Sequence, residues 1–303
     1  MRKLFQVNWF ALWLSLAVAS MFLGAGAAKA VAPDSNSVAS LRAKYAELGD
    51  QLSNNEFKRP LYVASMESES NLKADIYTRV DYPFAAVSEA LTDPRRWCDL
   101  LILHLNTKHC RAGSNQGNSL LAVSIGRKHF QALSETSRVE FAYRVAANTP
   151  DYFDVELKAA KGPLETSDYR IELEATPLEG GKTFLHLTYS YTYNFAGRLA
   201  MQSYLATLGS DKVGFTRVGT QSDGQPSYID GVRGVVERNT MRYYLAIDAY
   251  LDALSAPPAQ QFEKRLRRWF ALTELYPRQL HEVDLDTYLG MKRREFQRMQ
   301  KPS

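Results

Sequence analysis

Residues that bind metals or carry redox chemistry are scarce in this sequence. It has two cysteines and five histidines among 303 residues. Neither Cys98 nor Cys110 belongs to a C-x-x-C pair, and the chain has no H-E-x-x-H or zinc-finger spacing. His104 and His109 lie close to Cys110, but their spacing matches no metal motif. A G-x-S-x-G elbow is also missing. We therefore expect no metal, no cofactor and no catalytic residue of these classes.

A large excess of charge is missing as well. The chain carries 37 Lys and Arg against 33 Asp and Glu. Arg2, Lys3 and Lys29 all lie in the first thirty residues, so 34 basic residues face 33 acidic ones in the rest. A net charge this small does not indicate the basic surface that binds DNA or RNA. We expect no nucleic-acid partner.

Long hydrophobic runs are limited to one, at the start of the chain. A short basic segment, 1–3, precedes the apolar run 9–28, and Ala28-Lys29-Ala30 closes it as an A-x-A cleavage site. This pattern predicts a signal peptide over residues 1–30, cleaved after Ala30, and a mature protein in the periplasm. The alternative is an uncleaved N-terminal membrane anchor, because about 20 apolar residues can span a bilayer.

If the protein is exported, its two cysteines are expected to form a disulfide. In an oxidising compartment a single pair, here Cys98 and Cys110, predicts a disulfide. Closing so short a loop contributes on the order of 3 kcal/mol in the chain-entropy view. The alternative is two buried thiols that never meet. Either role is structural.

Hydrophobic periodicity divides the rest of the chain into helices and strands. Residues 38–52 have helical spacing and predict a short leading helix packed on the domain surface. A strand over 74–80 follows, and then two short helices around 83–91 and 95–102. Further strands alternate apolar with polar side chains, as expected of an antiparallel sheet with one wet face. They cover 120–125, 139–145, 152–158, 168–175 and 183–192.

The strongest helical pattern comes late, over residues 232–254. Asp230 is its predicted cap and two prolines follow its end. Arg233 and Glu237, four residues apart, predict an exposed ion pair on this helix. Before it we expect a helix over 195–208 and a short strand pair. After it come further helices rich in Arg and Lys.

One stretch of sequence resembles a known family. IYTRVDYPFAAVSEALTDPRRW, residues 76–97, is similar to the opening of the START/Bet v 1-like (SRPBCC, helix-grip) superfamily: a strand, a patterned helix, then L-T-D-P-x-x-W. Asp93, Pro94 and Trp97 stand at the matching positions. The resemblance implies an α+β fold in which a curved antiparallel sheet wraps around a long late helix, with extra helices at the C-terminus. Residues 195–208 stay an alternative to 232–254 as the gripping helix.

These patterns together predict the organisation of the chain. It comprises a signal peptide (1–30), a leading helical segment (31–69), a START-like domain (70–256) and a C-terminal helical extension (257–303).

The resemblance also implies a function. A sheet bent around a helix leaves room for a ligand between the two. We expect a periplasmic binding or carrier protein for a hydrophobic small molecule, such as a lipid, a sterol or a quinone-like compound. The polar candidate is Asn239, beside Tyr243. The alternative is that Asn239, Tyr243 and the other candidate ligand-binding side chains only fill a core. The ligand-binding residues would be Tyr169, Leu187, Tyr189, Tyr191, Val236, Asn239, Thr240, Tyr243 and Ile247.

Other functions fit the same fold. A cyclase or aromatase-type enzyme would need an inward-facing titratable pair, and the predicted inward faces offer only tyrosine hydroxyls. An enzyme therefore stays uncertain and less favoured. A non-binding envelope scaffold is the third interpretation. The run 262–270 places aromatic residues among basic ones, which predicts either peripheral contact with an anionic membrane or packing on the domain itself.

Overall fold

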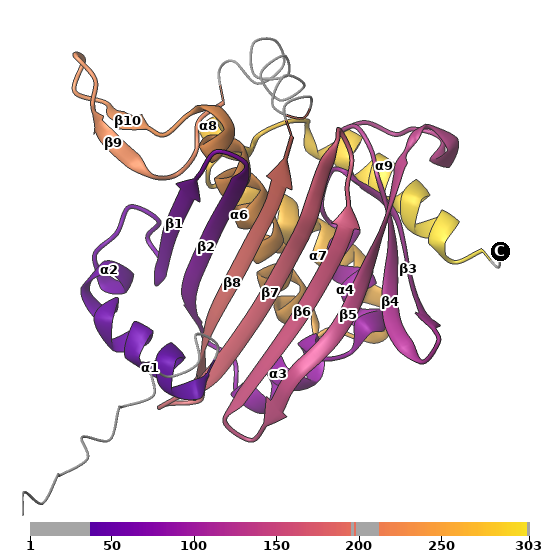
Figure 1. Ribbon diagram of the computed structural model, residues 1–303, viewed down its shortest axis with the longest axis horizontal. Coiled ribbons are helices and arrows are strands. Elements are labelled where there is room, and N and C mark those ends of the chain that lie inside the picture. Colours follow the sequence, from indigo (N-terminus) through magenta and orange to yellow (C-terminus); the bar gives the residue numbers. More distant parts are fainter. Residues whose placement is uncertain (1–36, 195–196, 198–211, 302–303) are drawn as a thin grey trace, which may run out of the picture. The chain divides into compact units, whose positions relative to one another are not determined.

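A computed structural model describes residues 37–194, 197 and 212–301 (Figure 1). A single curved antiparallel sheet dominates the fold, and its strands run in the order β1-β2-β8-β7-β6-β5-β4-β3. The strands are β1 (Leu61–Glu67), β2 (Asn71–Val80), β3 (Thr107–Asn115), β4 (Asn118–Ile125), β5 (Ser137–Thr149), β6 (Tyr152–Lys161), β7 (Thr166–Leu178) and β8 (Lys182–Tyr193).

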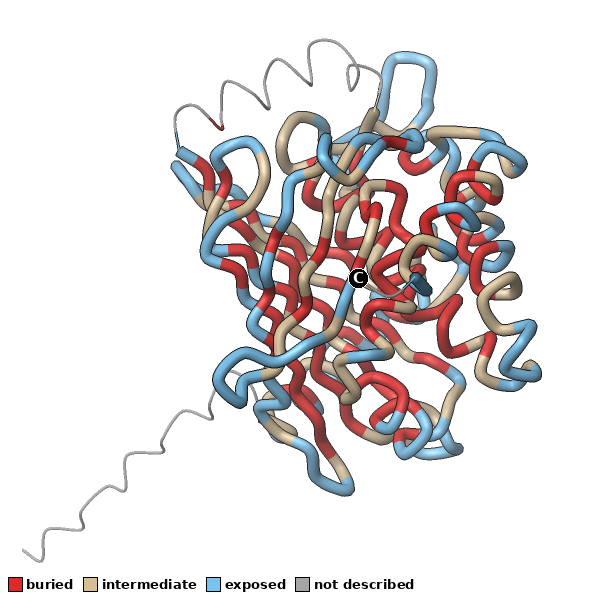
Figure 2. The backbone as a smooth tube through the Cα atoms, turned by 90° about the vertical axis from the view of Figure 1, so that its right-hand side faces the viewer, coloured by how far each residue is buried: buried red, intermediate tan, exposed pale blue. Residues whose placement is uncertain are grey.

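Helices cover one face of this sheet. The long helix α6 (Gly231–Ala253) packs on β1, β2 and β8 and against α4 (Pro94–Leu101) and α7 (Pro258–Thr273). In Figure 1, α6, α7 and α9 (Leu285–Met299) lie behind the strands. Figure 2 shows buried backbone both in the strands and in this helical layer. The described residues also form the helices α3 (Phe84–Leu91) and α8 (Pro277–Leu280) and a separate two-stranded sheet of β9 (Arg217–Thr220) and β10 (Pro226–Tyr228).

Residues of the segment 76–97, which resembles the family opening, cap α4 and hold it against α3. Asp93 accepts a hydrogen bond from the backbone N–H of Arg95 and so caps α4, while Pro94 occupies its first turn. The Trp97 indole is fully buried and donates to the carbonyl of Leu91 at 2.7 Å, which holds α4 against the end of α3. The motif thus fixes the corner between the two helices.

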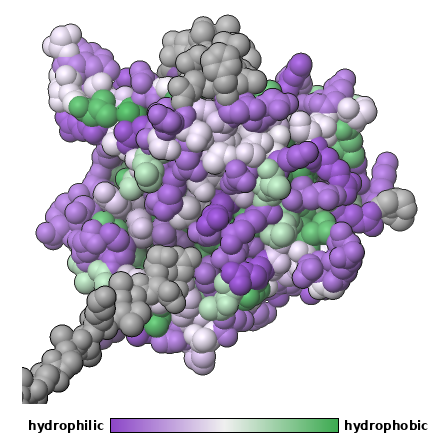
Figure 3. Space-filling view, in the orientation of Figure 1, coloured by the Kyte–Doolittle hydropathy of each residue, from purple (hydrophilic) through white to green (hydrophobic). Residues whose placement is uncertain are grey.

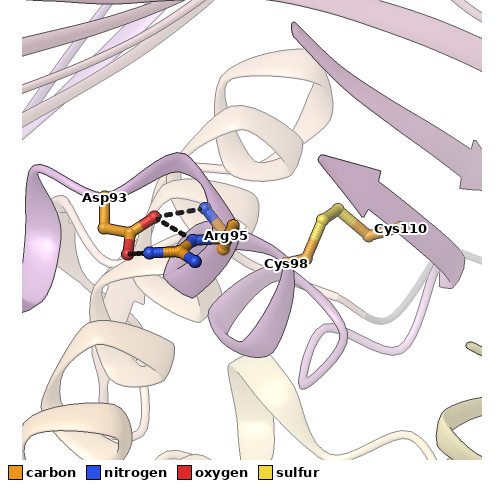
Figure 4. Close-up of a disulfide and its surroundings, with 4 residues drawn as sticks. All are labelled: Asp93, Arg95, Cys98 and Cys110. Carbon is orange, nitrogen blue, oxygen red and sulfur yellow. Dashed lines mark hydrogen bonds and ion pairs between the residues drawn. A yellow bond between two sulfur atoms is a disulfide. The ribbon is translucent and has the colours of Figure 1, made fainter. Parts of the chain in front are cut away.

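A disulfide ties the same corner to the sheet edge. Cys98 on α4 is bonded to Cys110 on β3, as the sequence predicts (Figure 4). Both cysteines are buried. The bridge links the short helix to the last strand of the sheet, which has only one strand neighbour.

The leading helices cover part of the opposite, outer face. They are α1 (Val38–Glu47) and α2 (Gly49–Ser53). Ser37 and Ser40 form a capping box at the start of α1. Leu41, Leu48 and Leu52 then pack with Tyr152 and Phe184 from the sheet. The predicted surface helix is therefore confirmed as two short helices.

Buried charges hold the C-terminal helix α9 in place. The ammonium of Lys292 donates to the carbonyls of His104 and Thr107 at 2.6 and 2.8 Å and pairs with Glu295 at 2.8 Å. Lys108 from β3 pairs with the same carboxylate at 3.0 Å. All three charged side chains are fully buried. Helix α9 is thus part of the core.

The predicted fold class is confirmed, with some local differences. Strands β1 and β3 were not predicted, because their burial fades along the strand and leaves no sustained alternation. Asp230 occupies the position before α6, but its side chain makes no capping hydrogen bond. The predicted signal peptide and, apart from residue 197, the predicted helix over 195–208 lie outside the described residues. Within those residues, no helix is long and apolar enough to cross a membrane.

Candidate functional site

Four tyrosines gather where the inner face of the sheet meets α6. The rings of Tyr169 and Tyr191 stack with centroids 5.1 Å apart, and Tyr189 lies 5.6 Å from Tyr191. Tyr243 on α6 meets Tyr189 edge-on at 5.3 Å. These ring contacts agree with the prediction that the tyrosine-bearing faces of β7 and β8 lie toward α6.

Local backbone geometry aims Tyr169 into this cluster. The register between β7 and β8 shifts between Ser167 and Arg170, and Asp168 has a φ of 51° there. Such a bulge re-aims the neighbouring side chain. Gly162 on the adjoining loop leaves room for the ring, because a Cβ at that position would lie 2.1 Å from Cε2 of Tyr169. The Tyr169 hydroxyl hydrogen-bonds the hydroxyl of Thr166 at 2.8 Å.

Most of the predicted ligand residues are buried core residues. Leu187, Val236, Thr240 and Ile247 are at most 2% exposed. The Thr240 hydroxyl donates to the carbonyl of Val236 one turn earlier, so its proton is not available to another acceptor. In the described structure these four residues supply apolar walls.

Tyr243 and Asn239 are different, because both are only half-buried although they lie in the middle of α6. Their neighbours in the fold, Tyr189 and His104, are 5% and 3% exposed. Within residues 236–251 of α6, Asn239 and Tyr243 are therefore the two less tightly covered positions. Burial raises the pKa of Tyr243, so its hydroxyl stays neutral.

His104 is an interior residue for which the sequence suggested no role beyond a possible metal ligand. Its ring stacks on Tyr243 with centroids 5.0 Å apart. Burial, together with Arg242 and Lys292, holds the pKa of His104 well below its ordinary value, so the imidazole is neutral. Nδ1 accepts a hydrogen bond from the backbone N–H of Asn106 at 3.1 Å. The proton therefore sits on Nε2, which has no hydrogen-bond partner among the described residues.

A group of cations lies beside this histidine. Arg242 on α6 and Lys128 from the β4–β5 loop both contact one carboxylate oxygen of Glu282, each at 2.7 Å. The ammonium of Lys212 donates to the carbonyl of His281. Although burial acts in the other direction, Arg242 and Lys128 hold the pKa of Glu282 below its ordinary value.

The predicted exposed pair between Arg233 and Glu237 is wrong. Glu237 is fully buried and accepts hydrogen bonds from the backbone N–H groups of Phe215 and Thr216 at 2.5 and 2.9 Å. The Ser65 hydroxyl also donates to it. The helical spacing of the two residues was read correctly, but the segment before β9 covers this part of α6. Glu237 anchors that segment.

The aromatic run 262–270 is largely turned inward. Trp269 is 1% exposed, stacks on Tyr288 at 5.0 Å and donates to the carbonyl of Arg242. Phe262 stacks on Phe296 of α9 at 3.7 Å. On the opposite side, Arg267 and Arg268 are exposed.

A second candidate lies on the outer face of the sheet. A hollow of about 630 Å³ is lined there by charged and hydroxyl side chains of β2, β6, β7 and β8. Figure 3 shows mainly hydrophilic side chains over these strands. His186 lies within the hollow and faces Glu174 through Nδ1 at 2.7 Å and Asp75 through Nε2 at 2.8 Å. The Tyr77 ring stacks on the imidazole at 4.0 Å.

The charges around His186 decide its chemistry. Burial alone would lower its pKa, but the hydrogen bonds to Asp75 and Glu174 raise it. Because both ring nitrogens face carboxylate oxygens, the doubly protonated imidazole is the form that satisfies both contacts. The Thr188 hydroxyl lies 3.2 Å from Nε2, yet it donates to Asp75 at 2.6 Å. The group resembles a hydrolase triad in composition only, because both imidazole nitrogens face carboxylates and the Thr188 hydroxyl donates to Asp75. It bridges β2, β7 and β8.

A second outer hollow, of about 690 Å³, lies beside β3 and β4 and the end of α9. Its charged lining residues are all basic, and they include Arg111, Arg138 and Arg298. The described residues contain no group of three or more His, Cys, Asp or Glu side chains that could hold a metal ion.

Comparisons with known proteins add little to this geometry. No family model and no curated protein matches the chain. Among solved structures, a point mutant of norcoclaurine synthase from Thalictrum flavum is 10% identical, with 48% of this chain and 91% of that chain covered and a TM-score of 0.34. For human StAR-related lipid transfer protein 5 the identity is 11%, the coverage 56% and 89%, and the TM-score 0.31.

An aromatase/cyclase from Streptomyces sp. R1128 is 12% identical, with 75% of this chain and 96% of that chain covered and a TM-score of 0.30. Similarity this low carries no argument about function. The helix-grip arrangement of this chain therefore rests on its own sheet and on α6.

Proposed function

We propose that this protein binds and carries a hydrophobic small molecule, a lipid, sterol or quinone-like compound, between the inner face of the sheet and α6. The observation that carries the proposal is the tyrosine cluster. Rings of Tyr169, Tyr189, Tyr191 and Tyr243 meet at the half-buried side of α6, with hydroxyls as the polar groups. Pockets for such ligands are mainly apolar and aromatic, with a few polar groups that set orientation.

The tyrosines would have to part to admit a ligand, because they contact one another in the described structure. Aromatic rings of this kind form both interior packing and ligand contacts. On this proposal Leu187, Val236, Thr240 and Ile247 are walls, while Asn239 and Tyr243 lie nearest the ligand. The half-buried side of α6 supports that placement.

We further propose that the protein acts in the periplasm after removal of residues 1–30. The Cys98–Cys110 disulfide supports an oxidising compartment. If the protein also rests on an anionic membrane, Arg267 and Arg268 would make the contact, because the aromatic residues of 262–270 pack against α6 and α9.

The test is extraction of the native protein. The full chain is expressed with its own leader, purified from the periplasm without detergent, and its co-purifying small molecules are identified by mass spectrometry. We expect about one hydrophobic molecule per chain. Asn239→Trp should reduce the amount, since an indole there fills the space beside Tyr243. Arg170→Trp, on the outer hollow, is the matched control and should not.

Each other outcome has a meaning. A folded protein that carries no hydrophobic molecule, and takes up none from lipid vesicles, would contradict the proposal and favour a scaffold. Reduction by Arg170→Trp instead of Asn239→Trp would move the site to the outer face. A bound molecule that changes chemically during incubation would identify an enzyme.

A further inference from the structure

The hollow beside β3 and β4 has a lining of one charge sign. Its volume is about 690 Å³, and it is bordered by the end of α9, which contacts β3 (Figure 1). We call it the β3–β4 hollow. A concave surface lined by charge of one sign attracts ligands of the opposite sign. The ionisable side chains that the structure describes in its lining are all basic: His109, Arg111, Arg138, Arg298 and Lys301.

Three of these cations have no carboxylate partner. In the part of the chain that the structure describes, no aspartate or glutamate forms an ion pair with Arg111, Arg298 or Lys301. Arg138 differs from them, because its guanidinium pairs with Glu140 at 2.8 Å. The β3–β4 hollow therefore has an excess of positive charge, although the chain as a whole is nearly balanced.

Neutral groups hold the guanidinium of Arg298 in place. Its two terminal nitrogens donate to the carbonyls of Gln131 and Lys108 at 3.2 and 2.9 Å, which joins α9 to the β4–β5 loop and to β3. The carboxylate of Glu295, one turn earlier on α9, already pairs with Lys108 and Lys292. Arg298 is thus a positioned cation, and its guanidinium has further N–H donors for an anion.

His109 on β3 shows that the arginines converge. Burial lowers the pKa of its imidazole, and three cations from β3, β5 and α9 lower it further: Arg298, Arg111 and Arg138. Because all three act on one imidazole, their guanidinium groups lie around the same part of the hollow. Ser124 lies opposite His109 on β4, and its hydroxyl group also lines the hollow.

The remaining lining and the size of the hollow restrict the class of anion. Leu120 and Leu133 line it beside the charged groups, and about 690 Å³ is far more room than a single inorganic ion fills. A phosphate monoester carries nearly two negative charges at neutral pH and three acceptor oxygens. It can therefore meet several unpaired cations at once, whereas a carboxylate has one charge and two oxygens.

We infer that the β3–β4 hollow binds a phosphate monoester with an apolar organic part. The phosphate lies between Arg111 and Arg298, and the organic part lies against Leu120 and Leu133. A soluble phosphorylated molecule and a lipid with a terminal phosphate head group share this chemistry. The site is separate from the tyrosine cluster, so the inference does not rest on the proposed function.

The experiment measures binding of phenyl phosphate and of benzoate to the mature protein at pH 7.5 by titration calorimetry. We expect phenyl phosphate to bind about ten-fold more tightly than benzoate, because it carries the additional charge and acceptor oxygen. Arg111→Gln removes an exposed guanidinium from the edge strand and should weaken phenyl phosphate binding about ten-fold, as the loss of a charge-assisted hydrogen bond warrants.

Two further variants make this result specific. Arg298→Gln should weaken phenyl phosphate binding to a similar degree, and thermal unfolding checks that the variant stays folded. Arg170→Gln removes an exposed arginine from the outer face of β7 and is the matched control. It should leave the affinity unchanged.

Vesicles identify the source of the phosphate. Co-sedimentation is measured with phosphatidylcholine vesicles that contain or lack phosphatidic acid. Binding of phenyl phosphate that Arg111→Gln weakens supports a soluble ligand. If phenyl phosphate does not bind, binding to the phosphatidic acid vesicles that Arg111→Gln weakens supports a lipid head group instead.

Three outcomes would overturn the inference. The first is binding of neither phenyl phosphate nor the phosphatidic acid vesicles by the folded protein. The second is an affinity that survives both Arg111→Gln and Arg298→Gln, which would place the anion elsewhere. The third is equal affinity for benzoate and phenyl phosphate, which would show that the hollow does not select phosphate.

Discussion

The two faces of strands β7 and β8 carry polar side chains that are stabilised in different ways. On the inner face, Tyr169, Tyr189 and Tyr191 are buried and uncharged, and ring contacts dominate. On the outer face, His186 is held between two carboxylates. On the inner face, a ring contact can be replaced by a contact with another apolar group at little cost in stability. On the outer face, stability depends on each charge having its partner. That difference is consistent with our proposal that the inner face binds a hydrophobic ligand, while the outer face holds the strands together.

The largest effect is expected from removal of an inner ring. Tyr189→Ala should lower the free energy of unfolding by about 3–5 kcal/mol, since it leaves a cavity among packed aromatic residues. Ser190→Ala, the next residue, faces outward and should change it by less than about 1 kcal/mol. Urea unfolding measures both variants. Equal losses would contradict the assignment of the two faces.

Removal of the outer cation comes next. His186→Gln leaves Asp75 and Glu174 facing each other with only Lys73, on Asp75, as a positive partner. It should destabilise the protein by about 3 kcal/mol, the lower end of the range for broken buried pairs, because Lys73 and water reach the edge of the site. The control is His129→Gln, at an exposed histidine, which should be neutral. Unfolding at pH 6 is the measurement, and a neutral His186→Gln would show that the bridge adds no stability.

The outer bridge should also make stability depend on pH. The pKa of His186 is raised above its ordinary 6.5, so its contribution is complete below pH 6.5 and is lost as the pH rises through the raised pKa. The pKa of Asp75 is lowered below 3.8, so its contribution is present above pH 3.8 and is lost on further acidification. The difference in unfolding free energy between the unaltered protein and His186→Gln should therefore be greatest between these limits. A difference that grows toward pH 9 would have the wrong sign.

The smallest effect is expected from a single inner hydroxyl. Tyr189→Phe keeps the ring and removes a hydroxyl whose interior partner is Tyr169. It should change the free energy of unfolding by no more than about 1 kcal/mol, the net value of one neutral hydrogen bond. Thermal unfolding together with Tyr189→Ala separates the ring from the hydroxyl. A loss as large as that of Tyr189→Ala would mean that the hydroxyl is a structural polar group and not an interchangeable part of a binding surface.

Alternation along the strands was sufficient to predict which residues of β7 and β8 face inward. Periodicity shows which face of an element is apolar but not which segment covers that element. The burial of Glu237 on α6 beneath the segment before β9 was therefore missed. The role of His104 was missed for a related reason. It lies in an irregular turn after α4, and its contacts with Tyr243 and Asn106 come from tertiary packing. No periodic signal marks such a residue.

The most direct test of the interior site is photochemical labelling. Diazirine analogues of hexadecanoic acid and hexadecanol are irradiated with the mature protein, and the labelled residues are identified by peptide sequencing. We predict labels on the inner face, at Tyr189 or Tyr191 of β8 and at Asn239 or Tyr243 of α6. Labels confined to the outer hollows, at residues such as Thr188 or Arg111, would contradict the central claim that the ligand lies between the sheet and α6.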